Sequence, residues 1–129
     1  MSIIDYRLQD PTFVRQDERG TFTEIVNHGP WHTVITGSMQ AGAIMGNHYH
    51  KGTRLFLFLT EGSARVDEIA VEDGMRSTCD LPAGTGVYLE PHHAHAIRFL
   101  APSTFILLKS RPYRDDDQDT YPYAVPSAD

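Results

Sequence analysis

The segment Gly46-Asn47-His48-Tyr49-His50-Lys51 places two histidines one residue apart at the end of a strand-like run. Side chains at positions i and i+2 of a strand project from the same face, with Cα atoms roughly 6.6 Å apart. These two imidazoles can therefore converge on one small target, either a metal ion or a reacting carbon. A further histidine cluster, Pro91-His92-His93-Ala94-His95, lies downstream where a turn leads into another strand-like run. Both clusters are candidates for the functional centre of the chain.

Short runs of β-forming residues separated by turn residues recur on both sides of these clusters, and no window has the apolar periodicity of a helix. The runs are residues 21–26, 32–36, 55–60, 64–70, 75–79, 86–89, 95–100 and 104–109. Asp73-Gly74 is a strong hairpin signal because tight hairpin turns need positive φ angles, and we expect Glu61-Gly62 to close another hairpin. The pattern predicts an all-β antiparallel sandwich or barrel with little helix.

The run Leu55-Phe56-Leu57-Phe58-Leu59 is apolar at every position, unlike a strand with one wet face. Such a strand is predicted to be buried on both sides. Small β-sandwiches avoid open sheet edges by pairing them, and an N-terminal strand donated to a second subunit would do this here. We therefore expect a homodimer.

The length, net charge and cysteine content of the chain limit the classes of protein to which it can belong. At 129 residues, it has the size of one domain, and we expect residues 1–129 to form it, with an extended acidic and proline-containing tail at about 111–129. A net charge of −6 with scattered basic residues argues against a nucleic-acid surface. Cys79 is the one cysteine, and no segment resembles a secretory signal or a membrane span. These features predict a soluble cytoplasmic protein.

The histidine pattern as a whole resembles the cupin superfamily, whose members are double-stranded β-helix barrels, or jelly rolls. The resemblance rests on the glycine before the first cluster, the apolar strand after it, and the run Pro82-Ala83-Gly84-Thr85-Gly86 before the second cluster. By position, the first cupin motif corresponds to Gly46, His48 and His50, and the second to Gly86, Pro91 and His95. The resemblance implies that these histidines meet inside a barrel.

A metal site of this kind would consist of His48, His50 and His95. The family usually adds a glutamate four or five residues after the second histidine, where this chain has Arg54 and Leu55. Three histidines with open positions suit zinc first, with iron, manganese or nickel as alternatives. Arg54 would add positive charge that opposes a cation and favours an anionic ligand. No organic cofactor is expected.

A narrower resemblance involves the segment Asp17-Glu18-Arg19-Gly20-Thr21-Phe22-Thr23-Glu24. It is similar to the opening of nucleotide-sugar epimerase cupins, which include the dTDP-4-dehydrorhamnose 3,5-epimerases and the cupin part of bifunctional capsular-polysaccharide reductase/epimerases. The second group also resembles this chain at residues 46–50 and at Asp119-Thr120-Tyr121. The sugar 3,4-ketoisomerases share a segment similar to His48-Tyr49-His50-Lys51.

This resemblance implies proton transfer at a carbon next to a ketone in a nucleotide-linked 4-keto-6-deoxy sugar. His48 is the expected base, while His50 and His95 either hold a metal or polarise the ketone. A tyrosine commonly returns the proton on the opposite face in the family. We expect Tyr121 in this role, with Tyr113 and Tyr88 as alternatives.

The resemblance also implies substrate-binding residues. Arg19 and Phe22 match family residues that contact the nucleotide, and Glu24 is expected to support them. Arg54 is the further candidate for binding an anionic substrate. The expected partner is thus a small molecule, with neither nucleic acid nor a membrane involved.

Two other functions fit the same pattern. The three histidines, with Met45 where many relatives carry a basic residue, also fit a metal-dependent cupin that acts on a less polar molecule, such as an oxygenase or a polyketide cyclase. A non-catalytic cupin that binds a sugar or another small molecule is the third possibility.

Overall fold

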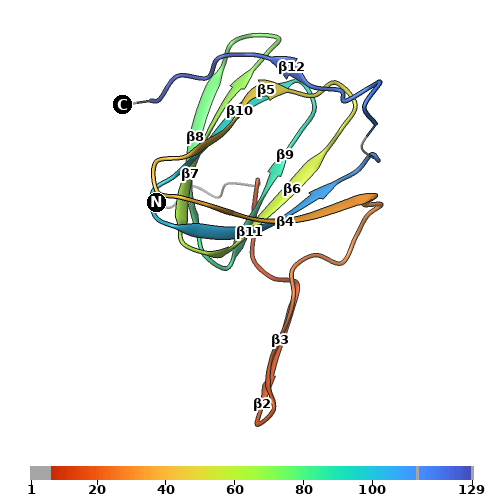
Figure 1. Cartoon of the computed structure of the whole chain (residues 1–129), viewed down its shortest axis with the longest axis vertical. Coiled ribbons are helices and arrows are strands. Elements are labelled where there is room, and N and C mark those ends of the chain that lie inside the picture. Colours follow the sequence, from red (N-terminus) through yellow and green to blue (C-terminus); the bar gives the residue numbers. More distant parts are fainter. Residues whose placement is uncertain (1–6, 113, 129) are drawn as a thin grey trace.

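Two five-stranded antiparallel sheets face each other in the computed structural model, which describes residues 7–112 and 114–128 (Figure 1). One sheet has the strand order β1-β9-β6-β11-β4, and the other has the order β12-β5-β10-β7-β8. The strands of the first sheet are β1 (Leu8–Gln9), β9 (Thr85–Leu89), β6 (Leu55–Glu61), β11 (Ser103–Lys109) and β4 (Thr33–Met39). Those of the second are β12 (Tyr121–Pro122), β5 (Ile44–Tyr49), β10 (His93–Phe99), β7 (Ser63–Ala70) and β8 (Arg76–Pro82).

The fold confirms the predicted all-β jelly-roll class. None of the described residues is helical, so this part of the chain contains no helix that could cross a membrane. Every predicted run overlaps an observed strand, and the Asp73-Gly74 turn joins β7 to β8 with Gly74 at φ +73°. Alternation and turn residues therefore located these strands, but β1, β12 and the strand Phe13–Asp17 lie outside the predicted runs.

Strand β6 confirms the prediction that Leu55–Leu59 is buried on both sides. Its leucines, Leu55, Leu57 and Leu59, join the core between the two sheets. Phe56 and Phe58 face the other way and pack in a second cluster, which Trp31 partly covers. Burial of a large side chain stabilises the fold by about 1.5–3 kcal/mol, so this strand contributes on both of its faces.

The prediction that Glu61-Gly62 closes a hairpin is wrong. Strands β6 and β7 pair with different neighbours, so this turn carries the chain from one sheet to the other. Gly62 has φ +99°, and a Cβ there would lie 2.1 Å from the Ser103 hydroxyl. A glycine before a strand signals a tight bend, but it does not tell which strand will be the partner.

A two-stranded hairpin projects from the sandwich (Figure 1). It consists of β2 (Phe13–Asp17) and β3 (Gly20–Glu24), paired in register from Phe13 opposite Glu24 to Asp17 opposite Gly20. All of β2 and most of β3 are exposed. The hairpin therefore contributes little to the core of its own chain.

The C-terminal segment follows the second sheet rather than running freely over the surface. Strand β12 pairs with β5, and Val125 is buried against Ala94 and Ala96. Asn47 of β5 holds this segment through its carbonyl, which accepts from Tyr123, and through its side-chain oxygen, which accepts from Val125. The segment thereby covers the edge of the strand that carries the first histidine cluster.

Candidate functional site

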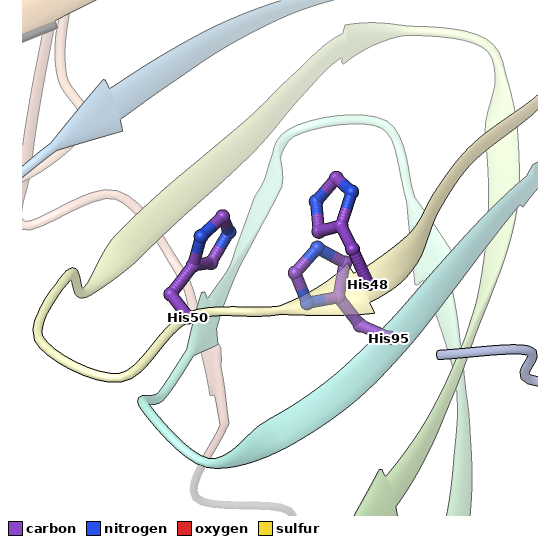
Figure 2. Close-up of side chains that lie close together, drawn as sticks. All are labelled: His48, His50 and His95. Atoms are coloured by element: carbon purple, nitrogen blue, oxygen red, sulfur yellow. The ribbon is translucent and has the colours of Figure 1, made fainter. Parts of the chain in front are cut away.

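His48, His50 and His95 converge on one point between the sheets (Figure 2). His48 belongs to β5, His50 follows its end, and His95 belongs to β10. The ring centroids are 5.0 Å apart for His48 and His50, 4.8 Å for His48 and His95, and 5.6 Å for His50 and His95. One nitrogen from each ring lies within 4.8 Å of the others. The structure thus brings together the three histidines that the sequence selected.

Gly46 explains how β5 approaches β10 so closely. It has φ +109°, and a Cβ at this position would lie 2.4 Å from the main-chain oxygen of His95. His48 pairs directly opposite His95, and the register shifts between His95 and Ala96. The amide of His92 donates to the carbonyl of His50 over 2.7 Å. The glycine, the bulge and this hydrogen bond together fix the two histidine clusters relative to each other.

The three rings line a cavity of about 190 Å³. Its apolar wall comes from both sheets and consists of Met45, Leu55, Leu89, Ile97 and Leu107. Besides the histidines, its polar lining consists of Lys109 and Thr120. An apolar pocket with a few convergent polar groups is the usual form of a small-molecule site.

Residues 15–121 match the polysaccharide biosynthesis C-terminal domain. The chain belongs to that family. A search of curated proteins found no match. The family match covers both histidine clusters and the projecting hairpin, so it includes every motif on which the sequence resemblance rested.

Solved structures of similar fold include nucleotide-sugar epimerases. The capsular polysaccharide assembling protein CapF from Staphylococcus aureus aligns with a TM-score of 0.70 at 20% identity, over 88% of this chain and 34% of CapF. The dTDP-4-dehydrorhamnose 3,5-epimerase from Sulfolobus tokodaii aligns with a TM-score of 0.72 at 19% identity, over 86% of this chain and 73% of that one. ChmJ, a 3'-monoepimerase from Streptomyces bikiniensis, aligns with a TM-score of 0.71 at 22% identity, over 84% and 65% of the two chains.

These likenesses establish a shared fold with the epimerases. The chain spans about a third of the length of CapF, so it corresponds to one part of that protein. The resemblance to nucleotide-sugar epimerase cupins is confirmed at the level of fold.

The three clustered histidines of this polysaccharide biosynthesis C-terminal domain, His48, His50 and His95, are electrically neutral at pH 7. Burial lowers the pKa of His48 to about 4, and the charge of Lys109 and repulsion between the protonated forms of His48 and His50 act in the same direction. Burial also lowers the pKa of His95 to about 3, with further contributions from His48 and His50. The pKa of His50 is lowered by burial too, although Asp119 partly opposes this. Neutral rings can accept a proton or ligate a metal.

One hydrogen bond fixes the tautomer of His50. Its Nδ1 lies 2.7 Å from the main-chain oxygen of Asp119. A carbonyl oxygen only accepts, so Nδ1 carries the proton and Nε2 presents a lone pair. Among the described residues, His50 Nε2 and His95 Nδ1 are both buried and have no hydrogen-bond partner. His50 therefore faces the cavity as an acceptor and cannot polarise a ketone by donating a hydrogen bond.

Lys109 is the site residue that sequence reasoning missed. It ends β11, where Phe105 and Leu107 already face the core, so strand alternation places its side chain on the cavity side. Its charge lowers the pKa of both His48 and His50. The alternation of Phe105, Leu107 and Lys109 was the signal that could have revealed it.

The prediction that Arg54 contributes charge to the cavity is wrong. Its Nε donates to Glu90 over 2.7 Å, and its guanidinium lies 4.3 Å from the ring centroid of Tyr88. Leu55 lines the cavity, so the preceding side chain points to the other face of the sheet. The cation near the histidines is Lys109 instead.

Neither Tyr121 nor Tyr88, two of the tyrosines predicted as proton donors, lies beside the three clustered histidines. The ring of Tyr121 lies 5.4 Å from that of Tyr49 on the outer face of β5, opposite to His48. Tyr88 belongs to the cluster outside the first sheet, where its hydroxyl lies 2.6 Å from His28 Nε2. Tyr113 lies outside the described residues. Strand alternation accounts for Tyr49 on the outer face, but it cannot show that Tyr121 pairs with it.

The predicted nucleotide-binding residues lie on the projecting hairpin, away from the histidine cavity of their own chain. Arg19 is paired with Asp17 over 2.9 Å, yet 79% of its side chain is exposed. Phe22 is 63% exposed, and Glu24 accepts from the hydroxyl of Thr12 over 2.9 Å. The motif forms a tight strand pair as its pattern indicates, but the pattern carries no information about where the pair points.

Proposed function

We propose that this chain is an epimerase or isomerase that moves a proton at a carbon next to the ketone of a nucleotide-linked 4-keto-6-deoxy sugar. The observation that carries the proposal is a neutral, half-buried His48 that shares a small cavity with Lys109. A base and a fixed positive charge are the two groups that enolate formation needs. The fold likeness to epimerases supports the same reaction class.

In this mechanism, His48 accepts the proton from the carbon, and the bonding electrons move into the carbonyl group to form an enolate. The ammonium group of Lys109 stabilises the negative charge on the enolate oxygen. His50 Nε2 accepts a hydrogen bond from a sugar hydroxyl, because its other nitrogen donates to Asp119. A proton from solvent then returns to the opposite face of the carbon and inverts the centre, and His48 releases the proton that it took up to water.

The reaction is tested by incubating the chelator-treated protein with dTDP- and UDP-4-keto-6-deoxyhexoses in deuterated water. We expect deuterium at C3 or C5 of the sugar, measured by proton NMR. Lys109→Met should lower the exchange rate by about 10²–10³-fold, because one stabilising group for the developing charge is lost.

Lys51→Met is the matched control, since Lys51 carries the same charge but lies over the ring of Tyr121 on the outer face. This variant should exchange at the wild-type rate. Exchange no faster than in the absence of protein, with all substrates tried, would refute the proposed function.

The site also fits a divalent cation, and zinc is the metal we propose as the alternative to the metal-free mechanism, because a His48 ring that ligates zinc has no lone pair left to act as the base. Three neutral imidazoles surround one point, and two of them have buried nitrogens without a partner among the described residues. Zinc takes nitrogen donors readily, although the charge of Lys109 reduces its affinity here. Zinc in this position would polarise a substrate oxygen as a Lewis acid.

Elemental analysis after zinc loading and desalting tests this part of the proposal. We expect about one zinc per chain in the wild type, because two ligands come from paired strands and the third, His50, is held by its hydrogen bond to Asp119. His95→Ala should retain far less, while His93→Ala, altered on the same strand but outside the cluster, should retain the wild-type amount. Equal retention by the wild type and His95→Ala would exclude this metal site.

We further propose that two copies of the chain associate through the projecting hairpin. Phe13 and Phe22 lie on the same face of the hairpin. Phe22 is directly opposite Arg15, and Phe13 shares the face of Arg15 because it precedes Arg15 by two residues on the same strand. Strand β4 is an open edge of its sheet, and its Val34 is 67% exposed. A hairpin of one copy pairing with β4 of the other would cover both surfaces.

This arrangement also gives the nucleotide a place to bind. The histidine cavity, at about 190 Å³, is smaller than the 300–1,000 Å³ typical of ligand pockets, so it suits the sugar alone. Arg19 and Phe22 of the second copy are our candidates for contacting the nucleotide. The dimer and the substrate are thus linked proposals.

Light scattering of the eluted protein measures the dimer directly. We expect the wild type to have twice the chain mass of 14.5 kDa, and the double variant Phe13→Ser with Phe22→Ser to have the mass of one chain. Met75→Ser serves as the control, because Met75 is also exposed but lies in the turn between β7 and β8, in the sheet that does not contain β4. A wild type that stays monomeric at micromolar concentration would rule out the dimer.

A further inference from the structure

We propose that Asp119 is a positioning residue that sets which ring nitrogen of His50 faces the cavity. Its main-chain carbonyl holds the imidazole, and its carboxylate holds the turn that follows His50. This inference does not depend on the proposed reaction, because the state of the His50 ring can be observed without substrate.

The first contact of Asp119 is the hydrogen bond that its main-chain carbonyl accepts from the His50 ring. His50 follows the last residue of β5, Tyr49, so strand pairing does not hold it in place. It is nevertheless buried, and its Nδ1 donates to the carbonyl of Asp119 over 2.7 Å. Bonds of this kind from the second nitrogen of a histidine commonly fix the tautomer and orientation of a functional imidazole.

The second contact is a set of hydrogen bonds that the Asp119 carboxylate accepts from residues 51–53. Oδ1 accepts from the amide of Lys51 over 3.0 Å. Oδ2 accepts from the amide of Gly52 over 2.8 Å and from the hydroxyl of Thr53 over 2.7 Å. These three donors belong to the residues directly after His50. A single residue thus restrains both the ring of His50 and the chain beyond it.

The backbone of Asp119 is in an uncommon conformation that allows this double contact. Its φ is +51°, in the left-handed region that residues other than glycine seldom adopt. The side chain is buried, and Arg111 lies 3.4 Å from its carboxylate. The three donors on the turn, together with Arg111, restrain the residue whose carbonyl is directed at His50.

The consequence for the site is chemical as well as geometrical. With Nδ1 protonated, Nε2 presents a lone pair to the cavity, which suits a substrate hydroxyl or a metal ion. A ring released from Asp119 can exchange its tautomer or rotate, and it would then present a donor to the same place. Asp119 therefore decides the hydrogen-bonding character of the site without lining the histidine cavity.

Nitrogen-15 NMR of the histidine rings in the metal-free protein tests this inference. In the wild type, we expect the His50 signals of an Nδ1-protonated ring, with slow exchange of that proton with water. In Asp119→Ala, we expect mixed tautomers and exchange at least tenfold faster. Asp117→Ala is the control, because Asp117 also pairs with Arg111 over 3.2 Å but is not among the acceptors of the turn amides or the His50 ring.

Thr53→Val supplies an independent test if Asp119→Ala does not fold, because it removes only one of the three donors. Faster exchange of the Nδ1 proton in either folded variant supports the inference. A His50 ring that keeps its wild-type tautomer and exchange rate in the variant that folds overturns it. A changed ring in a protein that never exchanges sugar protons would support this inference and refute the proposed function.

Discussion

His48→Gln is expected to lower the rate of deuterium exchange into a 4-keto sugar nucleotide by about 10²–10⁴-fold, the range that a general base usually contributes. Glutamine is close in size to histidine and can form hydrogen bonds, but it cannot take up a proton at neutral pH. His48 lies only partly buried on the cavity wall, so the fold should tolerate the change. The rate is followed by proton NMR with the substrate at saturating concentration.

The control for this experiment is His93→Gln. His93 precedes His95 by two residues on β10, yet it is not among the residues that line the cavity. Its variant should retain the full exchange rate. If His48→Gln and His93→Gln both react like the wild type, His48 is not the base.

The second large effect is a loss of stability in mild acid. In metal-free protein, we expect the free energy of unfolding to decrease between pH 6.5 and pH 4 by about 1–2 kcal/mol per pH unit. His48 and His95 have folded pKa values of about 4 and about 3, below the unfolded value of 6.5. The unfolded chain binds protons in this range and the folded chain does not, so falling pH favours unfolding. Two fully buried histidines would give about 2.7 kcal/mol per pH unit, and the expected decrease is smaller because His48 is partly exposed to solvent.

Urea unfolding at a series of pH values measures this slope. His95→Asn should show a slope reduced by a third to a half, because the more deeply buried of the two titrating rings is gone.

Asp119 contributes to the pH dependence of stability at lower pH than the histidines. Burial alone would raise its pKa, but hydrogen bonds from Thr53, Gly52 and Lys51 outweigh burial and hold the pKa at about 2. Its contribution is present above pH 3.8 and is lost only as the pH falls through about 2. A wild-type stability that stays constant from pH 7 to pH 4 would contradict the neutral state of the histidines.

Much of the fold could be predicted because the relevant information is local. Alternation and turn residues located the strands, and the unbroken apolar run of β6 indicated burial on both faces. The convergence of His48 and His50 followed from their spacing on one strand. The addition of His95 came from the family resemblance, because nothing local shows that β10 pairs with β5.

The errors concern contacts between distant segments. The partner of Tyr121, the sheet change at Gly62 and the direction of the hairpin all depend on how separate strands assemble. Arg54 is different, because its orientation could have been deduced from the burial of Leu55 on the adjacent position. Lys109 could have been found in the same way from the phase of β11. Both cases show that strand phase should be applied to charged residues as well as to apolar ones.

The hairpin and the histidine cavity occupy separate parts of each chain, and no residue lines both. Substitutions in one can therefore accumulate without disturbing the other. Under the proposed function, an enzyme built this way can change the nucleotide that carries the sugar during evolution while the chemistry at the sugar ring is conserved.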